Sequence, residues 1–270
     1  CSAAARNVPV KVNRFRDRFG PSKVIIGMIH LPPLPGYPES PGIERILRHA
    51  TGDLAVLEDA GVHGVLVENE YDRPHRIKAE PETVAAMTRI TRAIVQESDT
   101  AAVGCEILLN DPRASLAVAR MARAAFIRTD YFVDRMTRPE YGEFEIDPDG
   151  VIDYRLSIGA EDVLILADIQ VKYAKMVNPR SLAASAKEAE RRGADAIVVT
   201  GDRSGDAPTV EQLHEAAQGL PVLAGSGLTA DNAARLLDAC DGAIVGTSLM
   251  TDRAVDADKV AALMARVKGA

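Results

Sequence analysis

Apolar and polar positions alternate in blocks along most of the chain, with short apolar runs separated by longer segments of helical periodicity. Each apolar run predicts a buried strand. The eight runs begin at Val24, Gly64, Ala102, Ala125, Val163, Ala196, Pro221 and Gly242. Helices are predicted over Ile43–Asp59, Pro81–Glu97, Pro112–Arg123, Val151–Ala160, Pro179–Arg192, Val210–Ala217 and Asp231–Leu237. The chain is therefore expected to alternate strand and helix.

Strands that are apolar throughout, rather than on one face, are typical of a parallel sheet that helices cover on both sides. Eight strand–helix units in about 250 residues predict a (β/α)8 TIM barrel, an α/β fold, as a single domain. A doubly wound open sheet is the alternative, but it would carry a glycine fingerprint after its first strand. The first run instead leads into His-Leu-Pro-Pro-Leu-Pro-Gly at 30–36, which favours the barrel.

The barrel domain is expected over residues 23–270, and residues 1–22 are expected to form an N-terminal extension. This extension contains Phe15 and Phe19. The two aromatic residues predict a short helix that packs over one end of the core.

The charge and hydropathy of the chain indicate which classes of binding partner are not expected. The 270 residues are 47% hydrophobic and carry a net charge of −7 without a long basic run, so no nucleic-acid partner is expected. The longest apolar stretches are about half the length of a membrane span, so no membrane insertion is expected. Cys1, Cys105 and Cys240 are odd in number and widely spaced, which fits a reducing, cytoplasmic compartment better than a disulfide scaffold. A homo-oligomer is expected.

The stretch PVLAGSGLTADN, Pro221–Asn232, ends a predicted strand in Gly-Ser-Gly just before a predicted helix. Glycines let backbone N–H groups approach an anion closely, and a helix start adds partial positive charge. Val245–Ser248 repeats the pattern after the eighth run, and loops seven and eight of a TIM barrel commonly bind phosphate. Two tight turns with nothing bound are the alternative. The predicted phosphate contacts are Gly225, Ser226, Gly227, Gly246, Thr247 and Ser248.

Polar residues also end the first six apolar runs, where a TIM barrel carries its active site. In chain order they are His30, Glu68, Glu106, Asn110, Arg128, Asp130, Asp168, Gln170, Lys172 and Thr200. Alternation along a strand predicts that Asp168, Gln170 and Lys172 point the same way. Glu106 and Asp168 interrupt or end apolar runs, where an unpaired carboxylate is costly. Lys172 or Arg128 is expected to offset that cost.

Several carboxylates beside a lysine and a histidine are typical of acid/base chemistry on a phosphorylated sugar or nucleotide. The catalytic residues are predicted to be Asp168, Glu106, Lys172 and His30. The substrate contacts are predicted to be Glu68, Asn110, Arg128, Asp130, Gln170 and Thr200. The carboxylates could instead hold a divalent cation, since their oxygens are hard ligands. No metal ligand is assigned, because His30 has no second histidine at ligand spacing.

Five segments together resemble the BtpA family. They are IIGMIHLPPLPGYP from Ile25, ADIQVKYA from Ala167, VVTGDRSGDAP from Val198, VLAGSGLTADN from Val222 and DGAIVGTSLM from Asp241. The resemblance implies a TIM-barrel-like fold, and the founding member of the family is named for a role in photosystem I biogenesis. By motif it marks His30, Pro32–Gly36, Asp168, Lys172, Thr200, Gly201 and both glycine loops. A basic residue is expected after the second loop, where Leu249 and Met250 stand instead.

Two hypotheses of different classes follow. The first is a lyase, isomerase or nucleosidase-type hydrolase that acts on a phosphorylated sugar or nucleoside. The second is a non-catalytic assembly factor for a membrane complex, as the role in photosystem I biogenesis implies. Convergent carboxylates above a phosphate site favour the enzyme, and the lack of a basic amphipathic stretch counts against the assembly factor.

Overall fold

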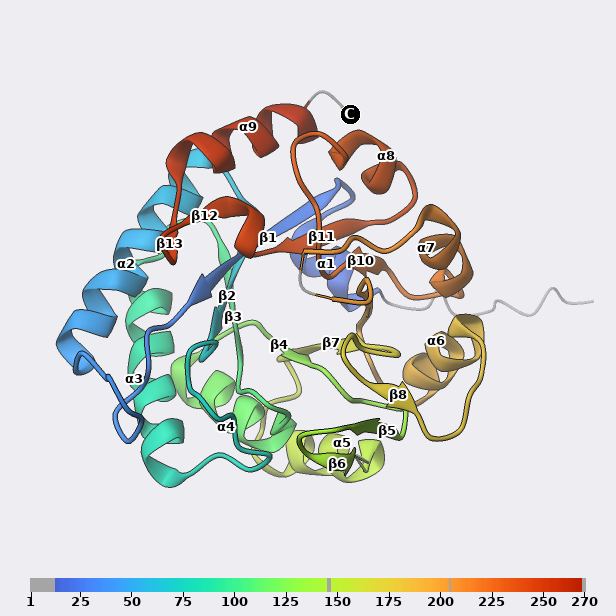
Figure 1. Ribbon diagram of the computed structural model, residues 1–270, viewed down its shortest axis with the longest axis horizontal. Coiled ribbons are helices and arrows are strands. Elements are labelled where there is room, and N and C mark those ends of the chain that lie inside the picture. Colours follow the sequence, from blue (N-terminus) through green and yellow to red (C-terminus); the bar gives the residue numbers. More distant parts are fainter. Residues whose placement is uncertain (1–12, 145–146, 204, 269–270) are drawn as a thin grey trace, which may run out of the picture.

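Eight parallel strands close into a barrel in the computed structural model, which describes residues 13–144, 147–203 and 205–268. Around the barrel the strands follow the order β1-β11-β10-β9-β7-β4-β3-β2 (Figure 1). They are β1 (Val24–His30), β2 (Gly64–Glu68), β3 (Ala102–Glu106), β4 (Phe126–Thr129), β7 (Leu164–Asp168), β9 (Ala196–Val199), β10 (Val222–Ala224) and β11 (Gly242–Val245). Each begins within two residues of a predicted run, and the predicted TIM barrel is confirmed.

A helix follows each barrel strand, and together these helices form the outer ring (Figure 1). They are α2 (Ile43–Ala60), α3 (Pro81–Glu97), α4 (Pro112–Ala122), α5 (Pro148–Ser157), α6 (Leu182–Arg191), α7 (Val210–Ala216), α8 (Ala233–Asp238) and α9 (Ala257–Val267). Local chemistry sets their starts: Pro81 and Pro112 occupy first turns, and Thr209 forms a capping box with Gln212. The apolar stripes of α2, α3, α4, α6 and α9 then pack on barrel strands that are buried on both faces, whereas α5 buries only Val151 and Arg155.

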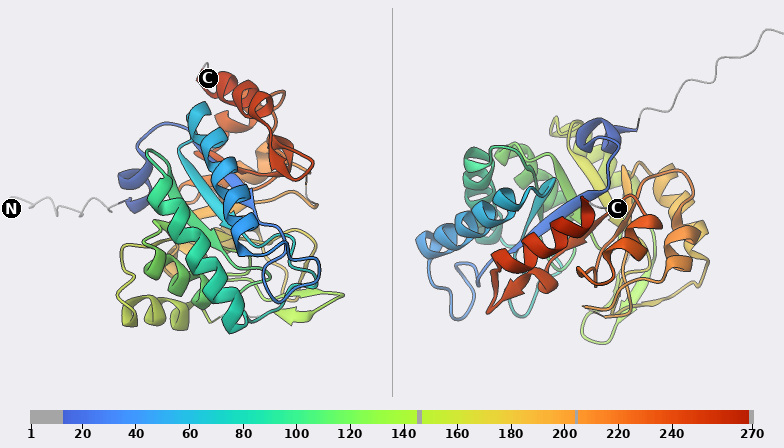
Figure 2. Two further views of the ribbon diagram at one scale, coloured as in Figure 1. Left: turned by 90° about the vertical axis from the view of Figure 1, so that its left-hand side faces the viewer. Right: turned by 90° about the horizontal axis from the view of Figure 1, so that it is seen from above.

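The N-terminal segment closes one end of the barrel through α1 (Arg14–Phe19). Phe15 is fully buried, and the Phe19 ring lies 5.8 Å from the Phe126 ring between centroids, so the expected helix over the core is present. Figure 2 shows α1 at the end of the barrel away from the β5–β6 hairpin. Residues 1–12, which belong to the predicted extension, lie outside the described residues. The boundary at residue 22 stays a prediction.

Five short strands outside the barrel are not anticipated by the sequence pattern. Three form an antiparallel sheet in the order β6-β5-β8, namely β5 (Met136–Arg138), β6 (Gly142–Phe144) and β8 (Lys175–Met176). The others, β12 (Met250–Thr251) and β13 (Ala254–Val255), pair after the 3-10 helix η1 (Thr247–Leu249). Two or three residues are too few to display a strand period, which explains why the sequence does not reveal these strands.

Two glycine-to-alanine substitutions, each of which adds one methyl group, test the packing between β3 and β4. A Cβ at Gly104 in β3 would overlap the Phe126 ring, whereas a Cβ at Gly52 in α2 would meet open space. We expect Gly104→Ala to destabilise the protein by about 1–3 kcal/mol, because the core is overpacked. Gly52→Ala should stabilise it by about 0.5–1 kcal/mol, because alanine favours a helix interior. Urea denaturation of both variants checks the opposite signs, and equal midpoints would contradict the packing described for β3 and β4.

Candidate active site

A cavity of about 750 Å³ lies at the carboxyl ends of the barrel strands. Its walls include most of the residues predicted for the site from sequence. These are His30, Glu68, Arg128, Asp130, Lys172, Gly225, Ser226, Gly227, Gly246, Thr247 and Ser248. The cavity therefore brings the two glycine loops and the acidic cluster together, although they are far apart in the sequence.

Five predicted residues do not line this cavity: Glu106, Asn110, Asp168, Gln170 and Thr200. Asn110 instead supports the loop after β4, because its Oδ1 accepts hydrogen bonds from Thr129 Oγ1 at 3.1 Å and Tyr131 N at 3.3 Å. Thr200 Oγ1 accepts the backbone N–H of Lys172 at 3.1 Å. Both residues hold neighbouring segments that contribute cavity residues.

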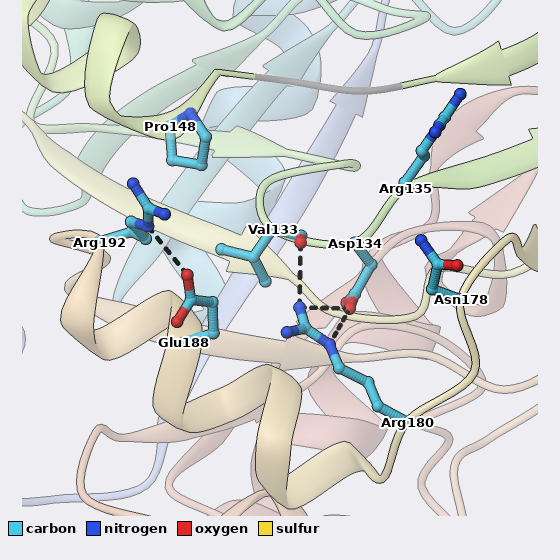
Figure 3. A pocket seen from close by; sticks show the side chains of 8 residues that line it. All are labelled: Val133, Asp134, Arg135, Pro148, Asn178, Arg180, Glu188 and Arg192. Atoms are coloured by element: carbon cyan, nitrogen blue, oxygen red, sulfur yellow. Dashed lines mark hydrogen bonds and ion pairs between the residues drawn. The ribbon is translucent and has the colours of Figure 1, made fainter.

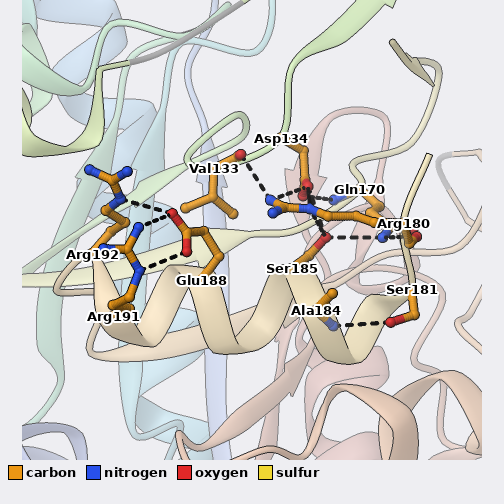
Figure 4. Close-up of polar contacts among 10 residues, drawn as sticks. All are labelled: Val133, Asp134, Gln170, Arg180, Ser181, Ala184, Ser185, Glu188, Arg191 and Arg192. Carbon is orange, nitrogen blue, oxygen red and sulfur yellow. Dashed lines mark hydrogen bonds and ion pairs between the residues drawn. The ribbon is translucent and has the colours of Figure 1, made fainter. Parts of the chain in front are cut away.

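Gln170 corrects the expectation that Asp168, Gln170 and Lys172 point the same way. β7 ends at Asp168, and Gln170 has a positive φ of 50°, so strand alternation no longer applies there. The Gln170 side-chain amide donates 3.0 Å hydrogen bonds to the Arg180 carbonyl and to Ser185 Oγ (Figure 4). Gln170 thus binds the start of α6 and not the cavity.

A second cavity of about 300 Å³ lies between the start of α5 and the length of α6, from Arg180 before this helix to Arg192 at its end (Figure 3). Arginines line it, but carboxylates already neutralise them. Arg180 pairs with Asp134 at 2.7 Å, and Arg192 pairs with Glu188 at 2.9 Å. Figure 4 shows these side chains as two closed networks along α6. The second cavity is therefore lined by structural ion pairs and is a weaker candidate for an anion site.

Arg128 is the buried cation of the larger cavity. It donates to Asp168 through two hydrogen bonds, from Nε to Oδ1 at 2.9 Å and from Nη2 to Oδ2 at 2.8 Å. Glu106 Oε2 lies 3.8 Å from the same Nε. The side chains of Arg128 and Asp168 are 4% and 0% exposed. Arg128 therefore stands between the two predicted catalytic carboxylates, and Asp168 has both oxygens engaged.

The barrel register aligns three further side chains. His30 is paired with Glu68 across β1 and β2, and Glu68 is paired with Glu106 across β2 and β3. Neighbouring strands are about 4.8 Å apart, so these side chains sit side by side in one layer of the barrel. Two buried carboxyl groups at that spacing cannot both be ionised freely. We therefore expect the carboxyl groups of Glu68 and Glu106 to retain a proton near neutral pH.

The direction of each pKa shift agrees with this arrangement. Burial, and then the neighbouring Glu70 charge, raise the pKa of Glu68 to about 8, and burial raises the pKa of Glu106 well above its usual range. A hydrogen bond between the two carboxyl groups favours the ionised form of Glu68 and the protonated form of Glu106. Burial, followed by the charge of Asp168, raises the pKa of Asp130 to about 6. Near neutral pH the Glu68–Glu106 pair holds a proton while Asp130 is mostly ionised.

His30 is a neutral member of the layer. Burial, followed by the charges of Lys172 and Arg128, lowers the pKa of His30 to about 4. Its Nε2 lies 3.8 Å from Glu68 Oε1, but a protonated Glu68 offers no negative charge to stabilise an imidazolium. The uncharged ring of His30 can donate one hydrogen bond and accept another.

The two glycine loops are in direct contact at the other wall. Ser248 Oγ donates a 2.6 Å hydrogen bond to the carbonyl of Leu228. The N–H groups of Thr247 and Ser248 open the 3-10 helix η1, so they have no carbonyl partner within it. Gly225 differs from its prediction, because its N–H already donates to the Val199 carbonyl at 2.8 Å. Gly227, Thr247 and Ser248 line the cavity, and among the described residues no backbone carbonyl accepts their N–H groups. We call these three residues the glycine cradle.

No group of three His, Cys, Asp or Glu side chains is placed to hold a metal ion within residues 13–144, 147–203 and 205–268. Two of the acidic residues of the site, Asp168 and Glu106, instead contact the guanidinium group of Arg128.

Sequence reasoning missed part of the cavity wall. Residues from the loop after β2, the loop after β3 and the added sheet also line the cavity, namely Glu70, Arg73, His75, Leu108, Leu109, Arg138, Glu140, Tyr141 and Tyr173. Most of these residues lie two or more positions beyond the end of a barrel strand, where the polar residues were sought. Pro139 and Gly142 are turn signals, but they do not indicate that this segment folds back over the cavity.

Comparison with known proteins gives the family. A model of the BtpA family matches residues 21–269. An uncharacterized protein of Archaeoglobus fulgidus is 38% identical over 249 residues, which cover 92% of this chain and 99% of that protein. The photosystem I biogenesis protein BtpA of Synechocystis sp. is 34% identical over 250 residues, which cover 89% of this chain and 86% of that protein.

Solved structures share the fold. (S)-3-O-geranylgeranylglyceryl phosphate synthase from Thermoplasma acidophilum, in complex with sn-glycerol-1-phosphate, aligns with a TM-score of 0.61 at 16% identity. The alignment covers 94% of this chain and 97% of the synthase. At that identity the likeness concerns the barrel architecture. Among the described helices, none has the length and apolar character needed to span a bilayer.

The proton held by Glu68 and Glu106 predicts a pH-dependent stability. Between about pH 5.5 and pH 7.5 the folded pair keeps protons that unfolded glutamates, with pKa values near ~4.3, have lost. The free energy of unfolding should therefore fall as pH rises, by about 1.4 kcal/mol per pH unit for each proton retained. The double variant Glu68→Gln and Glu106→Gln should show a flatter dependence in urea denaturation. Glu44→Gln, on exposed α2 surface, should keep the wild-type slope. Parallel curves for the double variant and wild type would contradict the shared proton.

Proposed function

The chain belongs to the BtpA family, and from this premise we propose that it is an enzyme acting on a phosphorylated small molecule by acid/base chemistry. One observation carries the proposal: the glycine cradle and the acidic cluster are walls of the same cavity of about 750 Å³. A phosphate group bound at one wall would fix the reacting atoms against the other wall. The substrate class proposed is a phosphorylated sugar or nucleoside.

The glycine cradle is the proposed phosphate site. Backbone N–H groups of Gly227, Thr247 and Ser248 border the cavity and follow β10 and β11, the position at which TIM barrels commonly bind phosphate. The Thermoplasma synthase that shares the fold holds a glycerol phosphate. Ser226 has a supporting role in this proposal, because its Oγ accepts from Gly201 N and donates to the Asp206 carbonyl.

Glu68 and Asp130 are the proposed acid and base, because both line the cavity. Asp130, mostly ionised near pH 7, would accept a proton from the substrate, while the Glu68–Glu106 pair would donate one. Lys172 would stabilise negative charge that develops on the substrate. This cycle of proton transfer fits a lyase, an isomerase or a nucleosidase-type hydrolase.

Asp168 and Glu106 are assigned here as positioning residues. Both carboxylates contact Arg128, and neither lines the cavity. A general base must reach the proton that it removes, and a carboxylate with both oxygens bound to a guanidinium has less capacity to accept one. We therefore assign the acid and base roles, which were predicted from sequence for Asp168 and Glu106, to Glu68 and Asp130.

A non-catalytic assembly role is the second candidate. It is favoured by the 34% identity to the photosystem I biogenesis protein of Synechocystis. The two candidates differ in what they require of the cavity. An assembly factor would retain its function when Asp130 and Glu68 are replaced by their amides, whereas the enzyme would not.

The acid/base assignment predicts a bell-shaped pH profile. Turnover should rise as Asp130 ionises above about pH 6 and fall as the Glu68–Glu106 pair loses its proton above about pH 8. Asp130→Asn should lower kcat by at least ~100-fold and remove the acidic limb. Sugar phosphates and nucleoside phosphates, screened by phosphorus NMR, supply the assay. Full turnover in both Asp130→Asn and Glu68→Gln would refute this chemistry.

The cradle predicts a charge-sensitive anion site. Thr247→Glu places a carboxylate beside the proposed phosphate, so ribose 5-phosphate binding measured by calorimetry should weaken at least ~10-fold. Gln96→Glu adds the same charge on the exposed face of α3 and should leave binding unchanged. If both variants bind ribose 5-phosphate like wild type, the phosphate lies elsewhere.

A further inference from the structure

The cavity continues past the acidic cluster to a wall that the proposed chemistry does not use. In the ring of eight strands, β10 and β11 lie across from β3 and β4. The far wall is therefore built by the loop after β3 and by the sheet inserted after β4 and β7. Figure 1 shows β5 and β6 on the side of the barrel away from β10 and β11. A ligand held in the glycine cradle would extend across the barrel toward this sheet.

Planar side chains form the far wall. The Arg138 guanidinium carbon lies 5.4 Å from the Tyr141 ring centroid and 5.7 Å from the Tyr173 ring centroid. We call these three residues, all of which line the cavity, the tyrosine wall. Tyr173 remains 48% exposed. Aromatic rings and guanidinium planes both stack on planar heterocycles, and the exposed face of Tyr173 gives such a ring an area to cover.

The tyrosine wall stands on its own apolar cluster. Leu109, Tyr131, Met136, Phe144 and Val171 are buried together, apart from the main core. The Tyr131 and Phe144 rings stack with centroids 4.9 Å apart, and Tyr141 packs against Phe144 at 5.9 Å. Rigid support of this kind lowers the entropy cost of holding a ligand ring in place.

One buried polar atom beside the wall, His75 Nδ1, has no hydrogen-bond partner among the described residues. Among these residues Arg138 Nε also makes no hydrogen bond, and its contact is the ion pair with Glu140 Oε2 at 3.7 Å. His75 is 9% exposed and lines the same cavity. Burial, followed by the charges of Arg73 and Arg138, lowers the pKa of His75 to about 3, so its ring is neutral. An unsatisfied buried polar atom is costly unless a ligand supplies a partner. The polar edge of a heterocycle carries such donors and acceptors.

We propose that the tyrosine wall binds the base of a nucleoside 5′-monophosphate whose phosphate occupies the glycine cradle. The inference rests on the proposed function, because it places the phosphate at the same cradle. The ribose then lies between the two walls, beside Glu68, Asp130 and Lys172, where the acid/base chemistry is assigned. A cavity of about 750 Å³ has room for this ligand, since small-molecule sites measure roughly 300–1,000 Å³.

Calorimetry with adenosine 5′-monophosphate, uridine 5′-monophosphate, ribose 5-phosphate and inorganic phosphate tests the inference. We expect at least one nucleotide to bind ~10-fold or more tightly than ribose 5-phosphate. Tyr173→Leu should remove most of that advantage while leaving ribose 5-phosphate binding unchanged. Tyr154→Leu is the matched control, because Tyr154 also stacks on an arginine, Arg113 at 4.3 Å, but does not line the cavity.

The outcomes separate this inference from the proposed function. If ribose 5-phosphate binds and Thr247→Glu weakens it, but neither nucleotide gains affinity over it, the cradle stands and the base site is refuted. The base site is also refuted if Tyr173→Leu and Tyr154→Leu lose the nucleotide advantage equally. If no phosphate compound binds, the proposed function and the base site fail together.

Discussion

The ion pairs of Arg128 hold together the carboxyl end of the barrel. One guanidinium contacts Asp168 and Glu106 inside a wall that water scarcely reaches. Losing that cation would leave buried carboxylates without a partner, which is far more costly than the pair itself is stabilising. Burial raises the pKa of both Glu68 and Glu106, and the charge of Arg128 opposes this shift only in part, so the two carboxyl groups keep a proton. The protonation states of the cavity wall therefore follow first from burial and then from the charges beside each group.

Closure of the barrel brings the buried carboxyl groups to the same level as one another. Register places His30, Glu68 and Glu106 in one layer of β1, β2 and β3, so their chemistry depends on three strands meeting at one height. The glycine loops reach the same height from the other side of the ring through β10 and β11. A shift of one residue in any of these strands would turn the side chain to the opposite face.

The fold was predictable because each barrel strand is buried on both faces and most of the outer helices have one apolar stripe. The position of the acidic residues at strand ends was also predictable, because each of them ends or closely follows an apolar run. Sequence reasoning offered Arg128 and Lys172 as the two possible partners of Asp168, and the structure selects Arg128. The choice between them was not predictable, because a sequence does not state which strands are neighbours in the sheet. Gln170 was misplaced because alternation fails once the backbone leaves the strand at a positive φ. The tyrosine wall was missed because Tyr141 and Tyr173 lie in loops beside strands that are too short to display a period.

The separate apolar cluster beneath the added sheet has an evolutionary consequence. Leu109, Tyr131 and Phe144 pack with one another rather than with the main core of the barrel. Mutations in this module can reshape the far wall while the closed ring of strands keeps its stability, since distant substitutions add nearly independently. Relatives with the same barrel can therefore diverge in what they recognise by exchanging a single insertion.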